Sequence, residues 1–164
     1  MASLTWPALR PWLGTVARLL VGIVWIVAGA LKVGDLTASG RSVVAYRLLP
    51  YDASMFLGAV LPFLEIVLGA LLVLGLATRL AAAVSVLLFA VYIGAIASVW
   101  ARGLRIDCGC FGTGGDLTGD QRPQYAIEII RDIALLFVAG FLVLFPRTRL
   151  SLDGQLLDGS EARA

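Results

Sequence analysis

The feature that most constrains the fold is a series of apolar stretches, each long enough to cross a membrane. Residues 80–101 contain no charged side chain. Two other stretches carry one charged side chain each, Glu65 in residues 53–78 and Arg18 in residues 11–31. About 20 apolar residues in a helix cover the ~30 Å hydrocarbon core of a bilayer. The chain is 60% hydrophobic, against about 45–50% for soluble domains, so we expect a membrane protein.

A fourth apolar stretch, residues 133–145, is short unless its helix begins near Gln124 and includes three charged residues. With it, the sequence predicts an all-α membrane protein, a four-transmembrane-helix bundle in a single domain over residues 1–164. The alternative for the first stretch is a signal peptide cleaved after residues 28–30, but its length and the nearby Lys32 favour a span. The predicted spans are residues 12–33, 54–77, 80–100 and 125–146.

The connections between the spans differ in character. In residues 34–53, Val44 and Leu48 would share one helical face, which predicts a short interfacial helix after the first span, ended by Pro50. Residues 101–124 form a long, polar, glycine-rich loop. Residues 147–164 form a polar tail.

The orientation in the membrane is predicted from the cysteines, because lysine and arginine divide almost evenly between the two sides. Both cysteines lie in the loop 101–124, and a cysteine pair that cycles as a disulfide works best on the oxidising face. We therefore expect a multi-pass protein of the plasma or inner membrane. Its termini and tail would be cytoplasmic, and the cysteine loop would be extracytoplasmic.

The cysteine motif is RIDCGCFG, residues 105–112, in which Gly109 alone separates Cys108 from Cys110. One sulfur of such a pair can attack a partner's disulfide as a thiolate, and the other can resolve the mixed disulfide. A disulfide across one residue closes a small, strained ring that is easily reduced, and glycine tolerates the required backbone angles. The loop residues expected to support the pair are Asp107, Gly109, Phe111 and Gly112.

Two other interpretations of the cysteines remain open. Thiolates suit zinc or copper(I), but the chain has no histidine, and a closed zinc site needs four ligands. Asp107 or Asp116, or a second chain, would have to complete such a site. Alternatively, the cysteines are chemically inert or form a static disulfide, which would stabilise the fold little because the closed loop is short. A net charge of +2 gives no support for a nucleic-acid partner.

Charged residues inside the predicted spans are the second group of candidates. Glu65 lies near the middle of its span, where an ionised carboxylate costs about 2.5–3.5 kcal/mol. Its candidate partners are Arg18 and Lys32, towards opposite ends of the first span. The three residues either form a proton or quinone-headgroup site or include a structural ion pair.

The start of the fourth span carries Glu128, Arg131 and Asp132. Their spacing allows all three to share one helical face. Because they lie on the same side of the membrane as the cysteine loop, they either anchor that loop at the helix mouth or mark the membrane boundary.

The sequence resembles the DoxX/MauE group of small four-helix membrane proteins, and its MauE-like branch in particular. The segments that carry this resemblance are AGALKVGD (28–35), YRLLP (46–50), LPFLEIVLGALLVLGLATR (61–79), CGCFG (108–112) and RDIALL (131–136). The resemblance covers nearly the whole chain except its two ends. It implies a four-helix membrane bundle that handles disulfides of exported proteins, with a link to methylamine utilisation and to thioredoxin-fold or DsbA-like partners.

The resulting hypothesis is a membrane thiol–disulfide redox protein. Cys108 and Cys110 would exchange electrons with an extracytoplasmic thioredoxin-fold partner. No cofactor would be tightly bound, and quinone near Glu65, Lys32 and Arg18 is the candidate membrane carrier. The alternatives are a non-catalytic assembly or maturation factor for a redox enzyme and a cysteine-based metal-handling protein.

Overall fold

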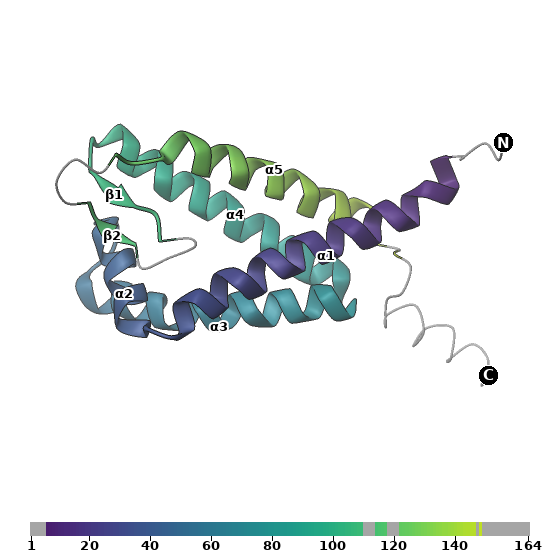
Figure 1. The fold of residues 1–164 in the computed structure, drawn as a ribbon, viewed down its shortest axis with the longest axis horizontal. Coiled ribbons are helices and arrows are strands. Elements are labelled where there is room, and N and C mark those ends of the chain that lie inside the picture. The colour runs from purple at the N-terminus through teal and green to yellow at the C-terminus, as the bar shows by residue number, and fades with distance from the viewer. Residues whose placement is uncertain (1–5, 110–113, 118–121, 147, 149–164) are drawn as a thin grey trace.

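The computed structural model describes residues 6–109, 114–117, 122–146 and 148. Within these residues, helices run along the length of an elongated bundle, and two short strands lie at one of its ends (Figure 1). The elements are α1 (Trp6–Val33), α2 (Leu36–Ala45), α3 (Tyr51–Leu74), α4 (Thr78–Ala101), β1 (Ile106–Asp107), β2 (Gly115–Asp116) and α5 (Tyr125–Leu144).

Three helices in the described part of the chain are long and apolar enough to cross a membrane: α1 over Arg10–Val33, α3 and α4. Helix α5 is not among them, and it carries Glu128, Arg131 and Asp132 in its first two turns. The all-helical membrane fold expected from the sequence is therefore confirmed. The fourth span stays a prediction.

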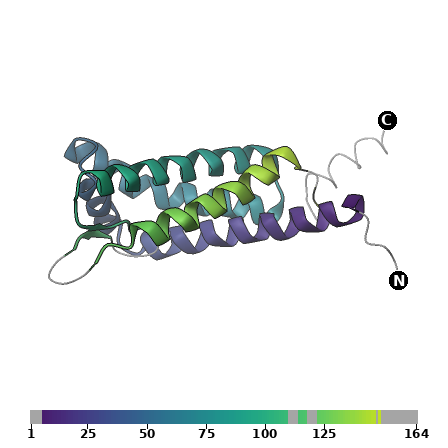
Figure 2. The same cartoon turned by 90° about the horizontal axis from the view of Figure 1, so that it is seen from above.

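The four long helices lie lengthwise beside one another (Figures 1 and 2). Helix α1 packs mainly against α3, and α4 packs mainly against α5. Helix α2 and the two strands lie at one end of the bundle, and the beginning of α1 and the end of α5 lie at the other. The loop that carries Cys108 therefore sits where α1 meets α2 and where α4 meets α5.

Helices α1 and α3 approach closely because glycines line their contact. A Cβ atom on Gly29 would lie 2.6 Å from the carbonyl oxygen of Pro62, and one on Gly69 would lie 2.6 Å from that of Gly22. Small residues at such positions allow the backbone contact that drives helix packing in lipid. This contact determines how Lys32 of α1 meets Glu65 of α3.

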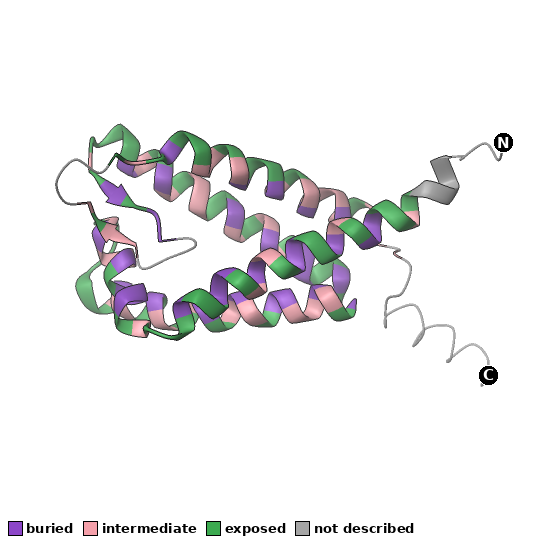
Figure 3. Ribbon diagram, viewed as in Figure 1, coloured by how far each residue is buried: buried purple, intermediate pink, exposed green. Residues whose placement is uncertain are grey.

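The interior of the bundle is aromatic and aliphatic. The rings of Trp25 on α1 and Phe89 on α4 stack with their centroids 4.5 Å apart, and the Trp25 Nε1–H donates to Ser85 Oγ at 2.9 Å. Exposed residues follow the outer sides of the helices (Figure 3), and many are large and apolar, such as Phe56 and Phe137. An apolar outer surface suits contact with lipid.

The end of α3 and the start of α1 differ from the predicted boundaries. Helix α3 ends at Leu74 rather than at 77, because Gly75 adopts a left-handed conformation (φ 70°) and its N–H bonds the carbonyls of the last turn. Helix α1 begins at Trp6 rather than at 12, and Pro11 lies inside it.

The short helix expected in residues 34–53 is present, but it lies earlier than predicted. Asp35 caps α2 by accepting a hydrogen bond from the N–H of Ala38 at 2.8 Å. The helix stops at Ala45, and Arg47 takes a left-handed conformation (φ 51°). Leu48 is therefore outside the helix, and the predicted helical face shared by Val44 and Leu48 is wrong.

Candidate functional site

Cys108 follows β1 directly and is 9% exposed. Strand β1 pairs with β2 in antiparallel register, with Ile106 opposite Asp116. The backbone at Cys108 is held from α2's end, because the Tyr46 hydroxyl donates to the Cys108 carbonyl at 2.9 Å. Tyr125, at the start of α5, holds the other side of the loop: its hydroxyl accepts from the Ile106 N–H at 2.9 Å. Neither the strand pair nor these tyrosine contacts were predicted from the sequence.

Gly109 is required by the shape of the loop. Its φ is 67°, a conformation that side chains disfavour. A Cβ atom there would also lie 3.0 Å from Ser42 of α2. The Gly109 N–H donates to Asp107 Oδ1 at 3.2 Å. Glycine between the cysteines thus lets the loop turn against α2. Its expected role in a Cys108–Cys110 disulfide ring stays a prediction. Cys110, Phe111 and Gly112 lie outside the described residues.

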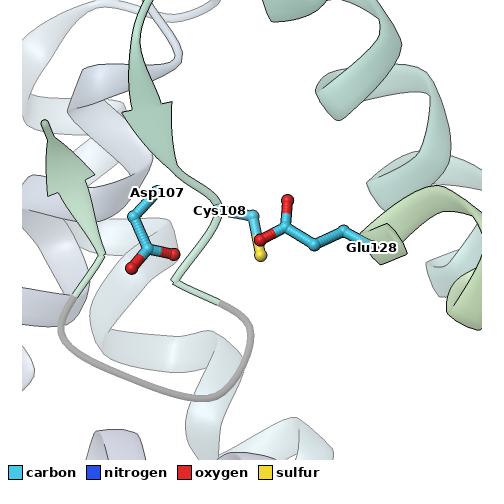
Figure 4. A group of neighbouring side chains, drawn as sticks. All are labelled: Asp107, Cys108 and Glu128. Carbon is cyan, nitrogen blue, oxygen red and sulfur yellow. The ribbon is translucent and has the colours of Figure 1, made fainter. Parts of the chain in front are cut away.

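Glu128 reaches the cysteine from the first turn of α5. Figure 4 shows its side chain extending towards the sulfur of Cys108, with Asp107 on β1 nearby. The sulfur and the carboxylate oxygens of Asp107 and Glu128 lie within 4.8 Å of one another. A carboxylate in this position can accept the thiol's proton.

A second polar group lies inside the bundle. Lys32 Nζ of α1 forms an ion pair with Glu65 Oε1 of α3 at 2.6 Å, and the Tyr92 hydroxyl of α4 donates to the same oxygen at 2.7 Å. Glu65 is fully buried and Lys32 is 9% exposed. Of the two candidate partners for Glu65, the structure pairs it with Lys32. Tyr92 was missed, although a tyrosine near the bundle core needs a hydrogen-bond partner.

Arg18 lies elsewhere. It is buried on α1, but it precedes Lys32 by almost four helical turns, which corresponds to about 21 Å along the axis. A single ligand headgroup would not bridge that distance. The structure therefore separates Arg18 from the Lys32–Glu65 pair.

Arg131 and Asp132 form an ion pair at 2.9 Å. Asp132 is buried, and it interacts electrostatically with Lys32. A void of about 10 Å³, room for about one water, is lined by Lys32, Glu65 and Asp132 among others. Of the three charged residues on α5, Glu128 therefore contacts the cysteine loop, whereas Asp132 faces the buried pair. The expectation that all three anchor the loop is corrected, because one helical turn separates the loop from the bundle interior.

A larger cavity of about 180 Å³ joins the two polar groups. Cys108 and Gly109 line one part of it, and Lys32 and Tyr92 line another. The remaining walls come mostly from apolar side chains of α2, α3 and α4 and of the segment between α2 and α3. No sequence pattern indicated this cavity.

Comparisons with known proteins give one match. Residues 10–145 match the family described as methylamine utilisation protein MauE. No curated protein and no solved structure matches the chain. The match supports the MauE part of the resemblance seen in the sequence and does not extend to DoxX.

Proposed function

The chain belongs to the MauE family, and we propose that it is a membrane thiol–disulfide redox protein in which Cys108 and Cys110 exchange electrons with a thioredoxin-fold partner outside the cytoplasm. The family description associates it with methylamine utilisation. In the proposed topology α5 is the fourth span, the termini are cytoplasmic, and the loop 101–124 faces the extracytoplasmic side of the plasma or inner membrane.

The observation that carries the proposal is the contact between the Cys108 thiol and the Glu128 carboxylate. Thiol–disulfide exchange begins with a thiolate, so a neighbouring base that takes the proton assists it. Glu128 is close enough to do so. Gly109, the one residue between the two cysteines, adopts a positive φ that glycine tolerates. The position of Cys108 at one end of the bundle suits exchange with a partner outside the membrane.

The proposed exchange is balanced between the two proteins. A thiolate of one protein attacks the disulfide of the other, which forms a mixed disulfide and releases one thiolate. The second thiolate of the attacking protein then breaks the mixed disulfide. Two electrons and two protons have moved: one protein now holds a dithiol and the other a disulfide.

Trapping of the mixed disulfide tests this function. The Cys110→Ser and Cys108→Ser variants each lack one of the two thiols. The variant that keeps the attacking thiol but lacks the resolving one should accumulate a covalent complex with a thioredoxin-fold protein. Mass spectrometry of the complex, released by reductant, identifies the partner. The double variant Cys108→Ser/Cys110→Ser is the control and should trap nothing.

The proposal fails if neither single variant traps a thioredoxin-fold protein and the wild-type pair never changes its redox state in cells. If the complex with a redox enzyme still forms and keeps its activity when both cysteines are serine, the result would instead support a non-catalytic assembly factor.

A metal-handling function is the second candidate, favoured by the proximity of Asp107, Cys108 and Glu128. One thiolate and two carboxylates offer three ligands, one fewer than a closed zinc site. This function predicts stoichiometric zinc or copper in the purified protein, lost in Cys108→Ser. Metal analysis of both proteins distinguishes it from the redox function.

A further inference from the structure

The cavity of about 180 Å³ lies at the end of the bundle that carries the cysteine loop. Its lining includes Leu61 from the first half of α3 and Ala95 from the second half of α4. These two helices are joined at their other ends by the turn at residues 75–77, so the cavity lies between the ends that are not joined. The cysteine loop closes one side of it through Cys108.

The mouth of the cavity is apolar and exposed. Leu48 is 51% exposed, Leu57 on α3 is 37% exposed, and both line the cavity. Since α3 is one of the helices suited to cross a membrane, an opening beside Leu57 would face lipid. A ligand that enters there is expected to partition into the bilayer.

Polar groups lie at the inner end of the cavity. Lys32 and Tyr92 both line it, and both contact Glu65, which lies behind them. The lysine ammonium has three N–H donors, of which one is directed to Glu65 Oε1. A carbonyl oxygen of a ligand placed there would accept from the lysine ammonium in apolar surroundings, where hydrogen bonds to charged groups are strong.

We propose that this cavity binds the headgroup of a lipid-soluble quinone against Cys108, with one quinone carbonyl directed at Lys32. The volume of about 180 Å³ has room for one six-membered ring, because an apolar protein cavity of about 150 Å³ accommodates benzene. An isoprenoid or alkyl tail would leave past Leu48 and Leu57 into the bilayer. Few other membrane molecules combine a single ring, hydrogen-bond acceptors and an apolar tail.

The inference rests on the proposed thiol function and gives it a direction. The reduced pair loses two S–H bonds and forms the Cys108–Cys110 disulfide, and the quinone takes up two electrons and two protons to become a quinol. The disulfide then oxidises the dithiol of the partner. Glu128 beside the Cys108 thiol, and Lys32 at the far end of the cavity, are placed to move the protons.

The experiment uses the full-length protein in lipid nanodiscs and decylubiquinone as the probe. Calorimetric titration should give saturable binding. Under anaerobic conditions the reduced protein should form one quinol per cysteine pair that is oxidised. Protein that neither binds decylubiquinone nor reduces it would overturn the inference, and an acyl chain as sole occupant of the cavity would produce that result.

Two tryptophan substitutions on α4 provide the matched pair. Ala95→Trp fills the cavity and should raise the dissociation constant at least tenfold. Ala90→Trp is on the same helix at an exposed position outside the cavity and should bind like wild type. Leu61→Trp, which fills the cavity from α3, repeats the test if Ala95→Trp does not fold. Equal binding by the cavity-filling and control variants contradicts the assigned site.

Partner trapping by Cys110→Ser and Cys108→Ser is scored separately. If trapping succeeds and quinone does not bind, the thiol function stands and the quinone inference fails. If quinone binds at the cavity and no partner is trapped, the binding site stands, and the thiol function fails only if the wild-type pair also never changes its redox state in cells.

Discussion

Glu128 places a carboxylate beside the one cysteine that the structure describes, Cys108, with the oxygen and the sulfur within 4.8 Å of each other. A negative charge beside a thiol has two opposing effects. It accepts the proton, which promotes reaction, and it repels the resulting thiolate, which slows it. Proton acceptance should dominate if the residue serves exchange chemistry, because the Glu128 side chain extends towards the Cys108 sulfur.

Glu128→Gln is therefore expected to slow the reaction of Cys108 with a small aromatic disulfide on the order of 100-fold near neutral pH, as general bases commonly contribute 10²–10⁴-fold. The measurement is made in the Cys110→Ser background over a range of pH. The loss should shrink as the pH rises, because hydroxide then removes the thiol proton without Glu128.

Asp107→Asn is the control for the nearby charge. Its amide oxygen can still accept the Gly109 N–H, so the loop keeps its turn. This variant should react within a few-fold of the parent. If Glu128→Gln reacts as fast as the parent or faster, Glu128 only repels the thiolate, and its role as a base is excluded.

The Lys32–Glu65 pair makes a different residue-scale prediction. Lys32→Met leaves the fully buried Glu65 without its cation, and removing one partner of a buried pair costs about 3–5 kcal/mol of folding free energy. The double variant Lys32→Met/Glu65→Leu should recover most of that loss, since no charge is left unpaired. The free energy of unfolding, measured by denaturant titration in detergent micelles, checks both values.

A single variant as stable as wild type would show that the pair contributes nothing to the fold. A double variant no better than the single one would show that the loss comes from packing rather than from the unpaired carboxylate of Glu65.

At the scale of elements, α5 is the helix whose placement in the membrane needs its own test. It runs beside α4 along the bundle (Figure 2), yet its first two turns carry three charged residues. Asp132 is buried against the bundle, and Arg131 pairs with it. Charges that are buried within a bundle and paired can be accommodated in a span.

Single-cysteine labelling in the Cys108→Ser/Cys110→Ser background tests that placement. If α5 crosses the membrane as proposed, Asp116→Cys should react with a membrane-impermeant maleimide in intact cells. Thr148→Cys, beyond the end of α5, should react only after permeabilisation. Arg79→Cys, in the first turn of α4, is the internal reference and should behave like Thr148→Cys.

Labelling of both Asp116→Cys and Thr148→Cys in intact cells would mean that α5 does not cross. Labelling of Arg79→Cys and Thr148→Cys alone would invert the proposed orientation but keep the fourth span.

Helix α2 shows how local signals decide an element. Apolar spacing favoured a helix around Val44 and Leu48, but the cap at Asp35 starts it earlier. The helix that begins there places Ser42 against Gly109. The connection therefore forms the surface on which the cysteine loop turns, a role that spacing of apolar residues alone does not reveal.

At the scale of the whole molecule, the candidate site lies where several elements meet. Cys108 comes from the segment after β1, Glu128 from α5, Lys32 from α1, Glu65 from α3 and Tyr92 from α4. The cavity of about 180 Å³ is lined by Cys108, Lys32 and Tyr92, and it lies towards the ends of α3 and α4 that the turn at 75–77 does not join. Assembly of the bundle thus brings the thiol close to the buried ion pair.

The sequence alone determined the all-helical membrane class, the approximate extents of the apolar helices, the presence of a short helix after the first, and Lys32 as one of two candidate partners of Glu65. These properties depend on hydropathy and on the cost of burying charge, both of which are local. The same reasoning grouped Glu128, Arg131 and Asp132 on one face. It did not separate Glu128, which lies at the cysteine loop, from Asp132, which lies at the core of the bundle.

Only the tertiary structure selected Lys32 over Arg18 as the partner of Glu65 and added Tyr92 to the pair. It also placed Glu128 against Cys108. The cavity that Cys108 shares with Lys32 and Tyr92 is likewise visible only in the folded chain. Each depends on which residues of different helices face one another. That is set by close packing at glycines such as Gly29 and Gly69 and by hydrogen bonds between distant segments, which no spacing within one segment encodes.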